Sequence, residues 1–175
     1  MLAFIRNLIG VKTDRAVQSA LEALVKWDPT AATEAELRTM EQHLDELGIQ
    51  VAGARAAHER EQKEAEAIAK LAQQRMAAAE RLEQQLATET DPARKAELER
   101  SLETLVGMLE QMAPEVDREA ADAADAREFL EMLENAYAQA GAKLKAARSE
   151  LSRAHRDMAR ADQQRALAHA AQHRG

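Results

Sequence analysis

The dominant feature of the sequence is a long series of regularly spaced apolar residues in its second half. From Leu98 to Ala168 these residues recur in alternating steps of three and four, and only Glu119 and Arg165 are polar. A mean period near 3.5 keeps one stripe of a helix facing a partner helix, so the pattern predicts coiled coil. A helix over 92–170 would be about 120 Å long at about 1.5 Å per residue, and something must lie against it. We name this series the apolar stripe: Leu98, Leu102, Leu105, Leu109, Met112, Val116, Glu119, Ala123, Ala126, Leu130, Leu133, Tyr137, Ala140, Leu144, Ala147, Leu151, Ala154, Met158, Ala161, Arg165 and Ala168.

A second, weaker series of helically spaced apolar residues runs from about 37 to 86. His58, Glu61 and Arg75 interrupt it. Two signals compete for the start of this helix. Asp28 could serve as N-cap with Pro29 as the first helical residue, and Thr33 with Glu36 offers an alternative capping box one turn later.

A stop-and-restart signal at residues 88–92 separates the two series. Asp91 is a favoured N-cap, and Pro92 suits the first position of the next helix. Folding there gives an antiparallel hairpin in which the numbers of opposing residues add to about 180. Acidic residues between 34 and 46 then lie opposite Lys143, Lys145 and Arg148, which supports this register.

The fold predicted is all-α: an N-terminal amphipathic helix over 1–27, then a long antiparallel helical hairpin, a coiled coil, over 28–175. Beyond about residue 150 the second helix has no counterpart and forms a basic overhang. Pro114 removes one backbone donor inside the second helix, so we expect a kink or local break there. The hairpin and assembly contacts are assigned to leucines of the stripe: Leu98, Leu102, Leu105, Leu109, Leu130, Leu133, Leu144 and Leu151.

The N-terminal residues have the character of an interfacial membrane helix. Bulky apolar side chains lie beside cations, and no acidic residue precedes Asp14. Such a helix suits an anionic lipid surface. The alternative is a short helix that caps the end of a bundle by burying Phe4 and Ile5. The expected membrane contacts are Leu2, Phe4, Ile5, Arg6, Leu8, Ile9 and Lys12.

Composition and charge narrow the choice of function. The chain is 31% charged and 2% aromatic, and much of its apolar fraction is alanine, which is typical of long helices. Positive residues number 5 against 14 negative ones over 88–135, and 8 against 3 over 136–175. This separation favours head-to-tail or antiparallel pairing between chains, whereas a nucleic-acid binder usually has a basic balance and stacking aromatics. Without cysteine, disulfide and thiol chemistry is excluded, which fits a reducing cytoplasm.

No motif in the sequence predicts an enzyme, a cofactor or a metal centre. The two glycines of Gly48-Ile-Gln-Val-Ala-Gly53 have the spacing of a phosphate loop, but they lie in a helical series and no Lys-Ser/Thr follows. His169 and His173 are four residues apart, and two ligands make a weak metal site, so we interpret them as solvent-facing. The N-terminal apolar run lacks the cleavage site of a signal peptide.

The layout as a whole resembles the phage shock protein A/IM30 (Vipp1) family, bacterial relatives of ESCRT-III. The segment Leu24-Val-Lys-Trp-Asp-Pro, followed by residues 36–44, is similar to the family's AEDP…IREMExxL segment. The opening Met1-Leu-Ala-Phe-Ile-Arg is similar in character to the family's first residues. The matching positions are Asp28, Pro29, Arg38, Met40, Glu41 and Leu44.

The resemblance implies a peripheral protein on the inner face of the bacterial cell membrane. It would bind stressed or anionic membrane through residues 1–20 and polymerise through the hairpin, and family members also restrain a AAA+ transcription activator. Family members continue past the hairpin with further short assembly helices, and this sequence departs from that pattern, so polymer contacts of the family's kind would require residues 150–173 to supply them. Two alternatives stay open: a soluble adaptor that sequesters a regulatory protein such as a AAA+ activator, and a purely structural coiled-coil dimer.

Overall fold

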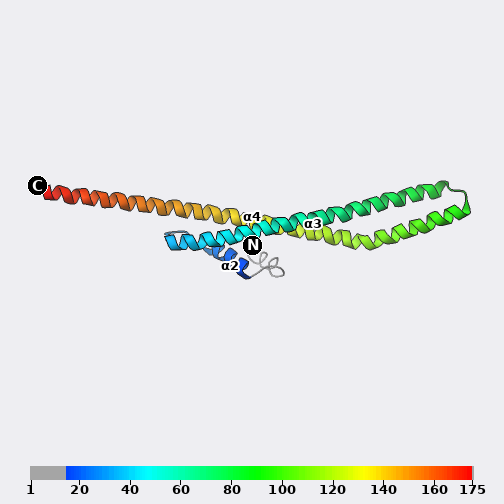
Figure 1. Cartoon of the computed structure of the whole chain (residues 1–175), viewed down its shortest axis with the longest axis horizontal. Helices are drawn as coiled ribbons and strands as arrows, with labels where there is room; N and C mark the ends of the chain where they lie inside the picture. Colours follow the sequence, from blue (N-terminus) through cyan, green and yellow to red (C-terminus); the bar gives the residue numbers. More distant parts are fainter. Residues whose placement is uncertain (1–14, 175) are drawn as a thin grey trace. The chain divides into compact units, whose positions relative to one another are not determined.

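The protein is all-α over the residues that its structure, a computed structural model, describes, which are 15–174 with side chains from Gln18 onward. Three helices make up this part of the chain: α2 (Arg15–Lys26), α3 (Glu34–Thr88) and α4 (Pro92–Arg174) (Figure 1). Two of them are very long, with 55 and 83 residues. The predicted fold class is confirmed at this level.

The chain divides into two compact units. Unit 1 combines Met1–Ala52 with Glu131–Gly175, and unit 2 is Gly53–Leu130. Unit 1 therefore contains α2 together with one end of α3 and one end of α4. Unit 2 contains the end of α3, the beginning of α4 and the short connection between them.

A capping box fixes the start of α3. The backbone N–H of Glu36 donates to the Thr33 hydroxyl oxygen, and the N–H of Thr33 donates to the Glu36 carboxylate, both at 3.2 Å. The two contacts satisfy donors that the first helical turn leaves without partners. Of the two predicted start signals, the one at Thr33 and Glu36 is correct, and Pro29 is not the first residue of the helix.

The connection between α3 and α4 lies at residues 89–91. Asp91 caps α4: its side chain accepts a hydrogen bond from the Ala93 N–H at 3.3 Å, and its carbonyl accepts the Lys95 N–H at 2.9 Å. Pro92 follows as the first helical residue, where its missing N–H has no intrahelical partner to lose. The assigned roles of Asp91 and Pro92 are confirmed.

Pro114 lies inside α4, and the helix continues on both sides of it without interruption. Of the two expected outcomes, the local break is wrong, and the kink stays a prediction. Proline removes a single hydrogen bond, and the apolar stripe keeps its phase from Met112 to Val116, so packing on either side still favours the helix.

Unit 1 holds the better-packed core. The largest fully buried side chains of the described residues all belong to it: Leu21, Leu24, Leu37, Leu47 and Leu133. One cluster joins Leu37 and Ala32 to Leu144 and Ala147 of α4, with Trp27 and other half-buried residues around it. Leucines of α3 and α4 thus meet in this cluster, and Leu21 and Leu24 of α2 are also buried within unit 1.

The core of unit 2 is thinner. Half of its buried residues are alanines, and none is a fully buried large side chain: Ala54, Ala79, Leu98, Met112, Ala123 and Leu130. Alanine buries little apolar area per residue, so each contact stabilises less than a leucine contact would. Arg75 reaches across from α3 and places its Nη1 2.9 Å from the Met112 sulfur.

Two glycines inside α3 have different surroundings. A Cβ added at Gly48 would lie 3.2 Å from Cε2 of Tyr137, whereas one added at Gly53 would have nothing within 4 Å. Gly48 therefore lets the Tyr137 ring approach the α3 backbone closely, and Gly53 has no such role.

We predict that Gly53→Ala raises the free energy of unfolding by about 0.5–1 kcal/mol, because alanine removes the conformational penalty of glycine in a helix. Gly48→Ala should raise it by less, since the Tyr137 ring must move to admit the new methyl group. Chemical denaturation of both variants measures the difference. An equal gain in the two would contradict the assigned role of Gly48.

Candidate interaction surfaces

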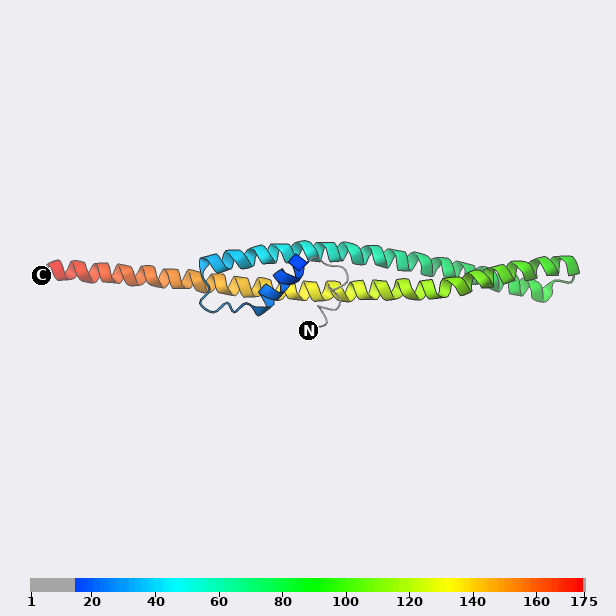
Figure 2. The ribbon, with the colours of Figure 1, turned by 90° about the horizontal axis from the view of Figure 1, so that it is seen from below.

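Helix α2 is docked on α4 within unit 1 (Figure 2). Ala20, Leu21 and Leu24 form its buried face. Beside them a small pocket of about 140 Å³ is lined by both helices, with Leu21 and Leu24 on one side and Ala140 and Lys143 on the other. The apolar side of α2 is thus occupied by contacts inside the protein.

Lys143 of α4 binds the C-terminal end of α2. Its Nζ donates to the carbonyl oxygens of Leu24, at 3.2 Å, and of Val25, at 3.4 Å. The last carbonyls of a helix lack intrahelical partners and carry partial negative charge, so a lysine there is favourable. The sequence placed Lys143 opposite the acidic residues of the first long helix, and these bonds to α2 are a different arrangement.

One ion pair between α3 and α4 follows the pairing of charges that the sequence predicts. Arg148 Nη2 of α4 contacts the Glu41 carboxylate of α3, and the two groups form an ion pair. The pairing of Arg148 with the acidic segment is therefore confirmed. Both side chains are about half exposed, so the pair contributes to register more than to stability.

These contacts involve the last part of the predicted N-terminal segment. Leu21 and Leu24 belong to the segment 1–27 that was predicted as one amphipathic unit, and they pack inside unit 1. The predicted membrane contacts lie outside the described residues: Leu2, Phe4, Ile5, Arg6, Leu8, Ile9 and Lys12. In the described residues no helix is long and apolar enough to cross a membrane.

A tight turn links α2 to α3. Asp28 Oδ1 accepts the hydroxyl of Thr30 at 2.7 Å and the backbone N–H of Thr30 at 3.0 Å. The N–H of Ala32 donates to the Pro29 carbonyl, and Ala31 has a φ of 56°, a left-handed conformation that is costly for alanine. The two bonds from Thr30, with a smaller contribution from the charge of Lys143, hold the pKa of Asp28 below its usual value.

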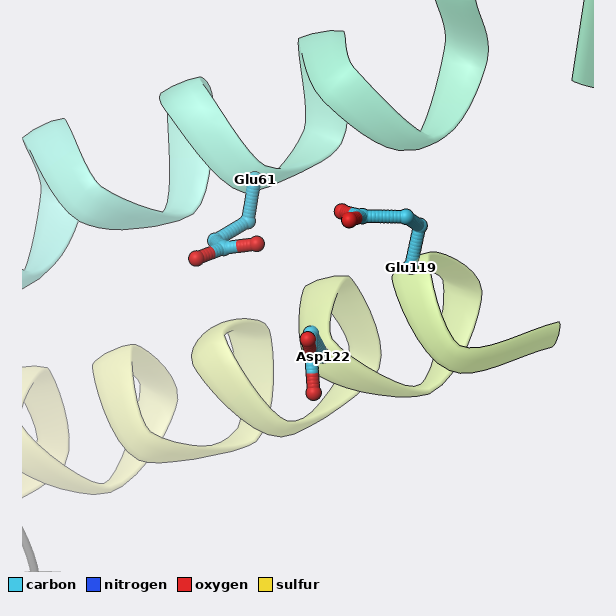
Figure 3. Close-up of side chains that lie close together, drawn as sticks. All are labelled: Glu61, Glu119 and Asp122. Carbon is cyan, nitrogen blue, oxygen red and sulfur yellow. The ribbon is translucent and has the colours of Figure 1, made fainter. Parts of the chain in front are cut away.

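Three carboxylates meet in unit 2 (Figure 3). Glu61 of α3 and Glu119 and Asp122 of α4 have oxygens within 4.8 Å of one another. Oε2 of Glu119 is buried and has no hydrogen-bond partner. Carboxylate oxygens are ligands for hard divalent cations, but an acidic cluster alone does not make a metal site, and we assign none. This group was not predicted from the sequence, although Glu61 and Glu119 are among the polar interruptions of the two apolar series.

The apolar stripe changes its environment along α4. Its members from Leu98 to Leu151 are buried or half-buried, apart from the exposed Tyr137. Beyond Leu151 the residues of α4 up to Arg174 are exposed, except for the half-buried Ala161. Met158 and Leu167 each keep 65% of their surface exposed, so the end of α4 presents apolar side chains to solvent.

The histidines near the end of α4 are exposed, as expected. The rings of His169 and His173 lie one turn apart with centroids 4.5 Å from each other. They share the exposed part of α4 with several arginines, which gives this segment its basic character.

Comparison with known proteins gives no match: no protein family, curated protein or solved structure is similar to this chain.

We predict that Thr30→Val raises the pKa of Asp28 towards its usual value, because the variant loses the stronger of the two hydrogen bonds to the carboxylate. A lowered pKa in the folded state stabilises the fold above the unfolded-state pKa, and that stabilisation is lost as the pH falls through the folded-state pKa. The variant should lose part of this acid-dependent change. NMR titration of the Asp28 carboxyl carbon measures the shift. Thr39→Val is the matched control, since the Thr39 hydroxyl donates to Ala35.

We predict that Lys143→Met lowers the free energy of unfolding by about 1 kcal/mol, because the methionine keeps the aliphatic stem but donates no hydrogen bond to α2. Lys145→Met removes the same charge from an exposed position and should have a much smaller effect. Denaturation followed by the fluorescence of Trp27, the single tryptophan, reports on unit 1. Equal losses in the two variants would show that Lys143 acts only through its charge.

Proposed function

We propose that the protein is a membrane-associated, self-assembling helical scaffold of the phage shock protein A/IM30 type, which binds or remodels anionic inner membrane during envelope stress. In this proposal α3 and α4 form the antiparallel coiled-coil hairpin. Residues before α2 contact the lipid, and α4 beyond Leu151 contacts other copies. The protein acts by covering and organising a surface rather than by catalysing a reaction.

Contacts within each unit support the hairpin. In unit 1, Glu41 pairs with Arg148, and Gly48 lies against Tyr137. In unit 2, Glu61 meets Glu119, and the connection at 89–91 joins the two helices directly. Within each unit, residues later in α3 meet residues earlier in α4: Glu41 and Gly48 meet Arg148 and Tyr137, and Glu61 and Arg75 meet Glu119 and Met112. This is the order that antiparallel pairing requires.

The observation that carries the assembly part of the proposal is the change in exposure at Leu151. Helix α4 buries most of its apolar stripe up to this residue. Beyond it the stripe residues recur with the same spacing but are largely exposed to solvent. An amphipathic helix that is stable only through packing needs a partner for its apolar face. Self-assembly supplies such a partner, and so would a bound regulatory protein, which keeps the adaptor as the second candidate.

The membrane part of the proposal depends on the sequence before Asp14 and on the docking of α2. Because the apolar face of α2 packs inside unit 1, the lipid contacts are assigned to Leu2–Lys12 alone and not to the whole of 1–27. Five bulky apolar residues with Arg6 and Lys12 suit shallow insertion among anionic head groups. Helix α2 then connects this segment to the helical body.

We predict that the full-length protein sediments with anionic liposomes and that Ile5→Glu/Ile9→Glu lowers the bound fraction more than about tenfold, since each buried apolar side chain contributes about 1.5–3 kcal/mol. The two residues are four apart in the sequence, and the variant leaves the sequence of α2 unchanged. Ile49→Glu, at an exposed position of α3, is the matched control. Raising the salt concentration should weaken binding because Arg6 and Lys12 act electrostatically.

Two results would overturn the proposal. Wild-type protein that stays in the supernatant with anionic liposomes excludes the membrane function and leaves the soluble adaptor. Electron microscopy that shows only a small monodisperse species, with and without lipid, excludes the scaffold.

A further inference from the structure

The part of α4 beyond Leu151 carries an apolar face that no described part of the chain covers. Upstream, Leu144 and Ala147 of the same stripe are buried in unit 1. Downstream, Ala154 and Ala168 are exposed and Met158 keeps 65% of its surface exposed. The residue pattern is the same on both sides of Leu151, so the downstream part has the character of a packing face without its partner.

Large and small residues alternate along this face in a regular way. The large ones, Leu151, Met158 and Arg165, recur every seven residues, and alanines lie three residues after each of them, at 154, 161 and 168. In a pair of parallel helices, equivalent residues face each other, so Arg165 would meet the partner's Arg165 and alanine would meet alanine. In an antiparallel pair each large residue faces an alanine, which fills the layer and separates the like charges.

We propose that residues 152–174 of α4 dock antiparallel on the same segment of a second copy of this chain. In the favoured register Met158 packs on the partner's Ala161, and Arg165 packs on the partner's Ala154. The twofold symmetry of the pair makes each contact twice. The proposal deepens the self-assembly part of the proposed function, on which it rests, by naming the segment and the partner.

The residues that flank the apolar face place no like charges opposite each other in this register, and Arg153, Arg156 and Arg160 lie at helix positions away from the contact. His155 comes to lie opposite the partner's Asp162, and Asp157 opposite the partner's Gln164. A shift by one heptad would instead bring Asp162 against the partner's Asp162. In the single chain Asp162 has only an exposed contact with Arg165 at 3.8 Å, so pairing disturbs no buried interaction.

The alternation also sets the strength of the contact. Alanine layers allow two helices to approach closely, but they bury little apolar area. A two-helix contact over about three heptads is therefore weak by itself, and the dimer should depend on protein concentration. Within a larger assembly, many such contacts would add through effective concentration.

The first test is sedimentation velocity of the full chain over a range of concentrations without lipid. We expect a concentration-dependent dimer, and we expect Met158→Glu to weaken it at least about tenfold by placing a charge in the packed layer. Gln163→Glu adds the same charge on the opposite side of the helix and should leave the dimer unchanged. Circular dichroism of each variant checks that α4 remains helical.

The second test fixes the direction of the pair. Because the chain has no cysteine, single-cysteine variants give an unambiguous cross-link. A mixture of Ala154→Cys and Arg165→Cys should form a disulfide between copies under mild oxidation, and either variant alone should not. Cross-linking of one variant with itself would overturn the antiparallel register.

The remaining outcomes separate this proposal from the membrane function. A chain that is monomeric at all concentrations but sediments with anionic liposomes overturns the docking and leaves the membrane function standing. A chain that dimerises without binding liposomes overturns the membrane function and leaves the docking standing. An oligomer that Met158→Glu leaves intact also overturns the proposal, because it must use another surface, such as the acidic residues of unit 2.

Discussion

A helix with one apolar stripe is stable in water only where something covers that stripe, and most features of this protein follow from that requirement. The stripe of α4 has a single period from Leu98 to Ala168, but what covers it differs along its length. In unit 2 it packs with an alanine-rich part of α3. In unit 1, α2 adds Leu21 and Leu24 to the contacts that α3 makes. Beyond Leu151 no described residue packs over the stripe, which is exposed there apart from the half-buried Ala161.

The short helix α2 has more influence on unit 1 than its twelve residues suggest. It contributes two of the fully buried leucines, and Lys143 holds its last turn through two carbonyl oxygens. Asp28 and Thr30 then turn the chain into the capping box of α3. A chain of local contacts thus connects the docking of α2 to the start of the long helix. Any segment that precedes α2 is attached to this well-packed part of the protein.

Periodicity and capping chemistry are local properties, and they are the parts of the structure that could be predicted from sequence. The box at Thr33 and Glu36, the cap at Asp91 and the pairing of Arg148 with the acidic segment are all found. The expected opposition of residues whose numbers add to about 180 also brings Glu61 to Glu119. The unbroken apolar period predicted a helix continuing past Pro114, but whether the helix breaks there could not be decided, because a proline signal indicates a lost hydrogen bond and not the packing that compensates for it.

The contacts that could not be predicted from the sequence are those that involve α2 or the turn after it, in addition to the two long helices. Lys143 was expected to face acidic residues of α3, but its Nζ donates to the carbonyl oxygens of Leu24 and Val25 at the end of α2, where the last carbonyls of a helix lack intrahelical donors. Likewise, Asp28 has the residue type of an N-cap, yet Thr30 captures its carboxylate in a turn. Lys143 was thus expected to meet side-chain carboxylates and binds backbone carbonyls instead. Asp28 does bind a backbone N–H, as an N-cap would, but in a turn rather than at the start of a helix.

Alanine content explains how one stripe can serve these different environments. Where leucines dominate, as around Leu37, Leu47 and Leu133, the contact fixes a single arrangement and buries its side chains fully. Where alanines alternate with larger residues, the helix surface is shallow and accepts another helix at close range without a deep interlock. Such a surface stabilises each individual contact only slightly, so its contacts can form and dissociate as copies are added. The leucine-rich part of the stripe therefore maintains the fold, and the alanine-rich part after Leu151 has the properties that a reversible assembly requires.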